Sequence, residues 1–178
     1  YYNAFLILSN GLEAKVGTLG SKYEFFHEWK RLNENEQGSV ALETMLRGIC
    51  KKENFLDLLE NFILFDHSGG RITKILARNH QYLGVNEAVK AYEARKLKEG
   101  KLGVFWHTQG SGKSYSMVFL ARKIRRKFAG SPTIVVLTDR DELKIAVFWA
   151  RRKQANLLLP AAMILYRNSM GIPASSSH

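Results

Sequence analysis

The feature that most constrains this chain is a glycine-rich loop of six residues, Gln109-Gly110-Ser111-Gly112-Lys113-Ser114. A short apolar run at 102–106 precedes the loop and is typical of a buried parallel strand. Helical periodicity continues from Lys113 to about Phe128, Gly130 can end the helix, and a second apolar run follows at 133–137. This order of strand, loop, helix and strand predicts a βαβ unit, and therefore an α/β fold with a parallel sheet.

The residues of this loop are suited to binding phosphate. Gly110 and Gly112 allow successive backbone N–H groups to converge on phosphate oxygens at a helix N-terminus, where the helix dipole also favours anions. Lys113 supplies a positive charge for the β- and γ-phosphates, and the Ser114 hydroxyl can ligate Mg²⁺. The general pattern GxxxxGK[ST] begins with glycine, whereas this chain has His107 there. A Gly/Ser-rich connector that happens to precede a lysine is the alternative, but the expected strand and helix on either side favour a nucleotide site.

The composition of the chain is that of a globular protein. It has 178 residues, 46% of them hydrophobic and 24% charged, which allows one domain or one domain and part of another. The 27 basic and 16 acidic residues give a formal net charge of +11, which favours a polyanionic partner, either a nucleic acid or an anionic membrane. The single cysteine, Cys50, excludes an intrachain disulfide and indicates a reducing, cytoplasmic compartment. The apolar runs are too short to span a bilayer, so we expect no membrane partner.

Periodicity predicts the elements that precede the loop. Short apolar runs bounded by turn residues indicate strands, and apolar residues at i, i+3, i+4 and i+7 indicate helices. The Asn10-Gly11 pair supplies the positive φ angles of a tight hairpin, Ser39 can cap one helix and Asn86 another. In chain order, we expect strands at 4–8 and 12–17, a polar loop at 33–39, helices covering 42–49 and 55–62, a strand at 72–77, and a helix from Asn86 to near Gly100.

Several short motifs occur together in an order that is typical of one family. They lie at 2–11, 28–30, 78–85, 106–114 and 138–140. From Tyr1 to about Leu143 the chain resembles the motor (R, or restriction) subunit of type I restriction-modification enzymes, which are superfamily-2 helicase-like DNA translocases that carry a nuclease domain. That subfamily tolerates His-Thr-Gln before the glycines, so His107 favours this resemblance over a generic kinase.

The resemblance implies parts of two domains. We expect the start of a RecA-like P-loop parallel-sheet lobe, preceded by the end of a restriction-nuclease-like α/β domain. On this basis 1–58 is the C-terminal end of the nuclease domain with a helical connector, 59–143 is the N-terminal part of the ATPase motor domain, and 144–178 is a divergent tail. The tail contains five basic residues and no acidic one, which indicates a reading-frame shift or a degenerate gene end. A lineage-specific tail with an amphipathic, membrane-leaning helix is the alternative.

The resemblance also implies a site for ATP and Mg²⁺. Gln109 to Ser114 hold the triphosphate in this interpretation, with Lys113 as the catalytic residue and Ser114 as a ligand of the metal. Gln81 matches the glutamine that recognises adenine, with Arg78 beside it in the same motif. A Gln amide can donate to one adenine atom while it accepts from the exocyclic amine. The alternative is that Gln81 is hydrogen-bonded to the backbone.

The partners follow from the same resemblance. Thr138-Asp139-Arg140 resembles motif Ia, which lies near the DNA backbone in this family, so Thr138 and Arg140 are candidates for DNA contacts. A solvated strand end without a ligand is the alternative. The expected partners are double-stranded DNA and the modification (methyltransferase) and specificity subunits of a type I site-specific deoxyribonuclease.

Two departures from the family limit the expected activity. The nuclease carboxylates and catalytic lysine of the family lie upstream of Tyr1, and no DEAD- or DEAH-like acidic pair follows on a later strand. Without a carboxylate that holds Mg²⁺ and orients water, hydrolysis should be very slow, so we expect ATP binding without turnover. Two other functions stay open. One is a small P-loop kinase, and the other is a non-enzymatic truncated remnant.

Overall fold

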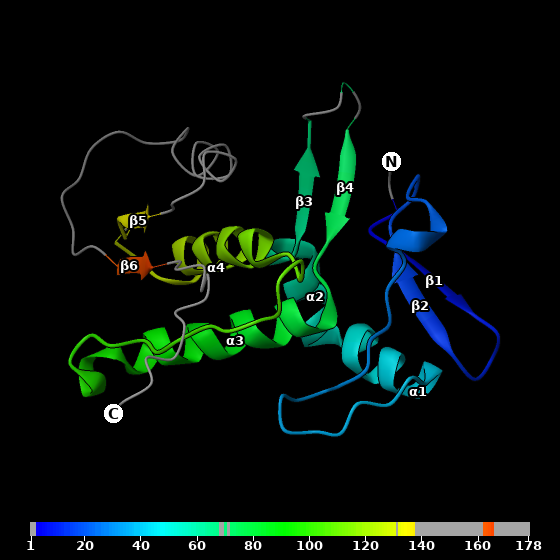
Figure 1. Ribbon diagram of the computed structural model, residues 1–178, viewed down its shortest axis with the longest axis horizontal. Helices are drawn as coiled ribbons and strands as arrows, with labels where there is room; N and C mark the ends of the chain where they lie inside the picture. The colour runs from blue at the N-terminus through cyan, green and yellow to red at the C-terminus, as the bar shows by residue number, and fades with distance from the viewer. Residues whose placement is uncertain (1–2, 68–69, 71, 131, 138–161, 166–178) are drawn as a thin grey trace, which may run out of the picture. The chain divides into compact units, whose positions relative to one another are not determined.

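The protein is mixed α/β and separates into two compact units. A computed structural model describes residues 3–67, 70, 72–130, 132–137 and 162–165 (Figure 1). The contacts between Cα atoms divide the chain into Tyr1–Lys123 and Ile124–His178. The domain boundaries expected from the sequence, after 58 and after 143, remain a prediction.

The N-terminal hairpin is confirmed, with a longer connection than expected. Strands β1 (Leu6–Ser9) and β2 (Ala14–Gly17) pair antiparallel, with Leu6 opposite Gly17 and Ser9 opposite Ala14. In the turn only Gly11 has a positive φ, at 95°. The side chain of Asn10 instead accepts hydrogen bonds from the N–H groups of Leu12 and Glu13, at 2.9 and 2.8 Å. This Asx-type turn replaces the two-residue turn that the Asn-Gly pair predicted.

The first predicted helix is short and changes geometry halfway. After a short 3-10 turn, η1 (Tyr23–Phe25), helix α1 (Leu42–Met45) leads into a π-helical turn, η2 (Leu46–Cys50). Ser39 does not cap it: the N-cap is Ala41, and the Ser39 N–H donates to the Lys30 carbonyl. Because a π turn has more residues per turn than the 3.6 of an α-helix, the expected apolar stripe breaks, and Leu46 is 43% exposed.

The next segment contains one expected and one unexpected element. Helix α2 (Lys52–Asn61) matches the predicted helix at 55–62, and Leu58 is fully buried. Strand β3 (Ile63–Asp66) follows at once and pairs antiparallel with β4 (Thr73–Leu76). The sequence did not predict β3, because the apolar residues at 62–65 continue the stripe of α2 without a turn signal.

Helix α3 (Asn79–Glu93) begins seven residues before the helix that the sequence predicted. The expected cap, Asn86, lies inside it, because the helix is initiated by a different contact: Gln81 Oε1 accepts a hydrogen bond from the N–H of the true N-cap, Arg78, at 2.8 Å. A 3-10 turn, η3 (Ala94–Lys98), continues α3, and Gly100 with φ of 83° follows it, close to the predicted end.

The predicted strand before the glycine-rich loop does not form. Residues 101–108 have no regular structure, and they pair with none of the strands that the structure describes. Gly103 adopts a φ of 111°, which interrupts the extended run, and Val104 and Trp106 are 94% and 74% exposed. An isolated apolar run has no partner for its backbone hydrogen bonds, so its β propensity is not realised.

Helix α4 (Lys113–Lys127) starts in the loop as expected, and Gly130 with φ of 95° follows its end. Strand β5 (Ile134–Leu137) matches the run predicted at 133–137. It pairs in parallel with β6 (Ala162–Leu165), from the acid-free segment, rather than with 102–106. The predicted parallel pair of 102–106 with 133–137, and with it the βαβ unit, is therefore wrong: β5 does take part in a parallel pair, but its partner is β6.

The core of the first unit joins the hairpin, the helices and the start of α4. Trp29 packs on Tyr82 of α3 with ring centroids 5.3 Å apart, and Phe62 lies between Tyr82 and Phe119 of α4, at 4.8 and 5.5 Å. Burying each side chain of this size stabilises the fold by roughly 1.5–3 kcal/mol. The largest fully buried side chains of this unit are Val16, Trp29, Met45, Ile49, Leu58, Phe62, Val85 and Phe119. None of the helices in the described part of the chain is both long and apolar enough to cross a membrane.

Candidate nucleotide site

Two glycines of the glycine-rich loop adopt left-handed backbone conformations directly before a helix. Gly110 and Gly112 adopt φ angles of 77° and 80°, in the left-handed region that favours glycine. Helix α4 begins directly after them, and the Tyr115 and Ser116 N–H groups already donate to the Gly112 carbonyl. The N-terminus of a helix of 15 residues therefore faces the loop, and its dipole favours an anion there.

Lys113 closes the loop on itself. Its ammonium donates a hydrogen bond of 2.8 Å to the His107 carbonyl, six residues earlier. Ser114 is half-buried in the first turn of α4, and Gln109 is exposed. The Ser111 hydroxyl is buried and has no hydrogen-bond partner among the described residues. A buried hydroxyl without a partner is unfavourable, so this atom is available for a ligand oxygen.

The N-terminus of α3 holds the loop in place. The Gln81 side chain is 3% exposed, and its Nε2 donates to the Gly112 carbonyl at 2.8 Å. His80 Nε2 lies 3.0 Å from the Ser111 carbonyl. Since Gln81 Oε1 also accepts from the Arg78 N–H, both ends of the amide are engaged, and the Arg78 residue itself is exposed. Gln81 thus bonds to the backbone, as the alternative interpretation expected, and its partner is the phosphate loop.

His107 fills the position where the general loop pattern has glycine. Its ring packs edge-on against His80 and Phe105, with ring centroids 4.8 and 4.5 Å apart. Gly84 of α3 makes room for this stack, because a Cβ there would lie 2.5 Å from Phe105 Cε2. Burial, and then the charges of His80 and Lys113, lower the pKa of His107, so its ring is neutral at neutral pH.

The predicted site residues are brought together, with two exceptions. Arg78, Gln81 and the loop from Gln109 to Ser114 form one neighbourhood around the N-termini of α3 and α4. Thr138 and Arg140 lie outside the described residues. Sequence reasoning missed His80 and Gly84 as supports of the loop, although both lie in the motif at 78–85.

Gln81→Ala is expected to destabilise the first unit by about 1–3 kcal/mol, because the Arg78 N–H and the Gly112 carbonyl both lose a buried partner. Urea denaturation measures this loss. Gln81→Glu is the matched variant. It keeps an oxygen that accepts from the Arg78 N–H, but it has an oxygen in place of the Nε2 that donates to the Gly112 carbonyl. Its loss of unfolding free energy therefore measures the contact with the loop alone. Unchanged stability in both variants contradicts the contact between α3 and the loop.

The sequence of this chain is similar to those of known proteins. The family model of the SWI2/SNF2 ATPase matches residues 80–157, a range that contains the loop, α4 and β5 and extends beyond 143, where we expected the resemblance to stop. The type I restriction enzyme HindI endonuclease subunit of Haemophilus influenzae is 39% identical over 156 residues, which are 83% of this chain and 15% of that protein. The putative type I restriction enzyme MjaIXP endonuclease subunit of Methanocaldococcus jannaschii is 31% identical over 167 residues, 80% of this chain and 16% of that protein.

These similarities confirm the resemblance that the motifs indicated. The chain is related to the endonuclease subunits of type I restriction enzymes, and its residues 80–157 are similar to the SWI2/SNF2 ATPase family model. It spans about 15% of the length of the HindI subunit. The activity, substrates and partners of such a subunit as a whole are therefore inferred below.

Proposed function

We propose that this chain is the nucleotide-binding segment of a type I restriction motor subunit and binds Mg-ATP through the loop from Gln109 to Ser114. One observation carries the proposal: the buried Ser111 hydroxyl, which has no partner among the described residues, lies in a loop whose two glycines have positive φ and whose lysine starts a helix of 15 residues. Backbone N–H groups at the N-terminus of a helix, next to such glycines, are groups that bind phosphate oxygens. The SWI2/SNF2 ATPase match over the same residues supports it.

In the proposed complex each residue has a separate task. Lys113 exchanges the His107 carbonyl for oxygens of the β- and γ-phosphates, and the N–H groups of the loop and of the first turn of α4 receive the remaining oxygens. Ser114 ligates Mg²⁺, which neutralises phosphate charge when it is bound. For Gln81 to recognise adenine, its amide must leave at least one of its present partners, Arg78 and Gly112. Adenine recognition by Gln81 and Arg78 remains a prediction.

We further propose that the chain comprises the end of a nuclease domain and the start of a RecA-like lobe. The position of the loop before α4 and the SWI2/SNF2 ATPase match over 80–157 support the second part. In the complete subunit, ATP hydrolysis would drive translocation along double-stranded DNA until cleavage, in a cytoplasmic complex with modification and specificity subunits. The residues that such a cycle needs for hydrolysis are not recognised in this chain, so we expect binding without turnover.

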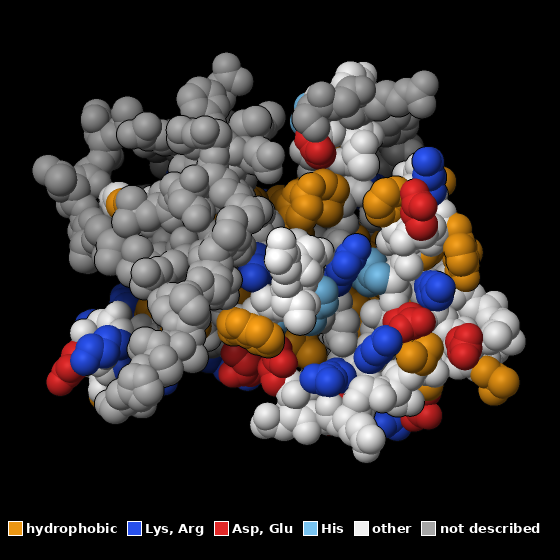
Figure 2. All heavy atoms as spheres, in the orientation of Figure 1, with side chains coloured by type: hydrophobic (Ala, Val, Ile, Leu, Met, Phe, Trp, Pro, Cys, Tyr) orange, Lys and Arg blue, Asp and Glu red, His pale blue; other side chains and the backbone are white. Residues whose placement is uncertain are grey.

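DNA contacts in this proposal rest on motifs rather than on charge. Figure 2 shows basic and acidic side chains intermixed over the described part of one face. A mixed surface of this kind attracts DNA much less than a patch of one sign. Thr138 and Arg140 therefore remain the candidates for phosphate contacts.

Removal of Mg²⁺ tests the metal part of the proposal. Chelation with EDTA is expected to weaken ATP binding by the 178-residue chain, and Ser114→Ala is expected to reduce this dependence on Mg²⁺ by roughly tenfold, since one metal ligand is lost. Isothermal titration with and without Mg²⁺ measures both. Ser116→Ala is the control, because this hydroxyl is on the same helix, is buried and has no partner among the described residues. If Ser114→Ala and Ser116→Ala behave alike, Ser114 is not the metal ligand.

A phosphoryl-transfer assay distinguishes the proposed ATP binding from the activity of a small P-loop kinase. The chain is expected to leave phosphate on ATP when it is offered small acceptors. Transfer of the γ-phosphate to such an acceptor would support the kinase instead, and a folded chain without any nucleotide affinity would support the non-enzymatic remnant.

A further inference from the structure

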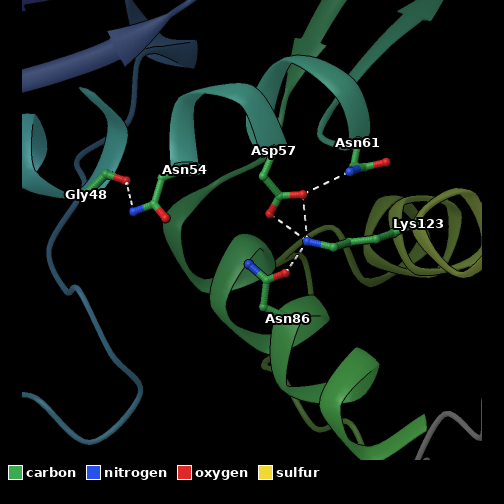
Figure 3. Close-up of polar contacts among 6 residues, drawn as sticks. All are labelled: Gly48, Asn54, Asp57, Asn61, Asn86 and Lys123. Atoms are coloured by element: carbon green, nitrogen blue, oxygen red, sulfur yellow. Dashed lines mark hydrogen bonds and ion pairs between the residues drawn. The ribbon is translucent and has the colours of Figure 1, made fainter. Parts of the chain in front are cut away.

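An ionic cluster built around a buried lysine joins three helices of the first unit, and its Asp57 and Asn86 are half-buried (Figure 3). Lys123, on α4, is only 8% exposed, and its ammonium contacts both carboxylate oxygens of Asp57, on α2, at 2.6 and 2.5 Å. The same ammonium donates to Asn86 Oδ1, on α3, at 2.5 Å. Lys123 is therefore bonded to α2 and α3 at once.

The cluster lies against aromatic rings and amide side chains, and one neighbouring amide oxygen, Asn61 Oδ1, is buried without a partner among the described residues. The Lys123 ammonium lies 5.1 Å from the centre of the Phe62 ring, and Asp57 Oδ1 also accepts from Asn61 Nδ2 at 2.9 Å. Burial, and then the negative charge of Asp57, raise the pKa of the neighbouring Tyr82. The pair of charges thus lies against aromatic rings, and its polar atoms have partners.

Stability alone does not account for a largely buried pair of this kind. Replacing a buried ion pair by apolar residues of similar volume is often neutral or stabilising, whereas removing one partner is strongly destabilising. Hydrogen bonds are directional, so they fix the axial position and rotation of one helix against another. An apolar contact is not directional and fixes neither. The best-attested use of buried polar groups is to fix such a register.

The helix that this cluster holds is the one that starts at the phosphate loop. Lys123 follows Lys113 by ten residues, which is about 15 Å along α4. Helix α3 contacts this segment at both ends, through Gln81 and the Gly112 carbonyl at the loop and through Asn86 and Lys123 further along. Because a helix is stiff over this length, a change of rotation at Lys123 moves the loop.

We propose that Asp57, Asn86 and Lys123 are positioning residues for nucleotide binding: they set the rotation of α4 so that Lys113 and the loop N–H groups meet the phosphates together. This inference rests on the proposed function, since it assumes that the loop binds Mg-ATP. It also makes α2, which crosses the expected boundary after residue 58, part of the support of the nucleotide site.

A double variant separates positioning from stability. Asp57→Leu with Lys123→Met removes both charges and keeps similar volume, so the chain is expected to retain its melting temperature within a few degrees but to bind Mg-ATP about tenfold more weakly. Lys123→Arg is the conservative rescue, because a guanidinium can still bond Asp57, and should keep the affinity within about threefold. Isothermal titration and thermal melting are measured on each protein.

Ile49→Val is the matched control, because this fully buried side chain belongs to η2 and not to the three helices of the cluster. It should lower the melting temperature and leave the affinity unchanged. Should the double variant fail to fold, Asn86→Ala keeps the ion pair but removes the Asn86 hydrogen bonds to Lys123 and to Tyr82, and it is expected to weaken binding about threefold.

The outcomes are distinguishable. A parent chain that does not bind Mg-ATP overturns the proposed function, and this inference with it. A parent chain that binds, with unchanged affinity in the folded double variant or in Asn86→Ala, overturns only the positioning role. The positioning role is also overturned if the double variant and Ile49→Val lose affinity for Mg-ATP in the same proportion to their loss of melting temperature. The lower affinity would then follow from lower stability alone.

Discussion

Lys113→Ala is expected to weaken Mg-ATP binding by about a hundredfold, because a cation that contacts phosphate oxygens makes charge-assisted hydrogen bonds that alanine cannot replace. In the protein without nucleotide, the ammonium donates to a backbone acceptor, the His107 carbonyl. Loss of this bond from a half-buried side chain should change the melting temperature much less than it changes the affinity. Isothermal titration gives the affinity, and a thermal melt confirms that the variant is folded.

Lys101→Ala is the matched control for this prediction. Its side chain also lies near the loop in the sequence, but it is exposed and pairs with Glu99 at 3.2 Å on the surface. Loss of an exposed pair of this kind changes stability and binding little. An equal loss of affinity in both variants would show that general charge, rather than the phosphate loop, attracts the nucleotide.

Phe62→Ala is expected to destabilise the first unit by about 3–5 kcal/mol, which is the usual effect of removing a large buried ring. Phe62 is fully buried where α2 ends, and it contacts the rings of Tyr82 on α3 and Phe119 on α4. Its removal also takes an aromatic face away from the Lys123 ammonium, 5.1 Å distant. The midpoint of urea denaturation should fall by a corresponding amount.

Phe65→Ala is the comparison, since Phe65 lies three residues further in β3 and is exposed. Its loss should change the midpoint by a small fraction of the loss in Phe62→Ala. Equal effects of the two variants would contradict the core described above.

The elements that the sequence predicted correctly are those whose signal is local. The hairpin of β1 and β2 and helix α4 combine an apolar pattern with a glycine at the expected place, and helix α2 follows from its apolar spacing alone. The left-handed conformations of Gly110 and Gly112 follow from the sequence in the same way, because glycine adopts such φ angles without a steric penalty.

The elements that were missed depend on contacts that periodicity does not contain. The run at 102–106 has the composition of a buried strand, but a strand requires a neighbour, and the described strands offer none there. Helix α3 starts at Asn79 because the Gln81 side chain bonds the Arg78 N–H, whereas the sequence favoured Asn86 as the cap. At η2 a π turn, which an i, i+3, i+4 pattern does not reveal, exposes Leu46.

The residues of the candidate site also fall into two groups, those that the sequence indicated and those that it did not. The loop residues were found from their spacing, and Gln81 and Arg78 from the family resemblance. The supports of the loop, His80 and the distant Asp57 and Lys123, act through contacts between segments far apart in the sequence. Lys123 is buried, but it lies in a basic stretch of α4. The sequence does not distinguish it from the neighbouring basic residues that are exposed.

Equilibrium dialysis of the 178-residue chain against labelled ATP with Mg²⁺ tests the central claim most directly. The phosphate-loop account predicts one saturable site per chain, competed by unlabelled ATP and lost when Mg²⁺ is chelated or Lys113 is replaced by alanine. A chain that circular dichroism shows to be folded, but that takes up no nucleotide in a saturable way, would contradict it.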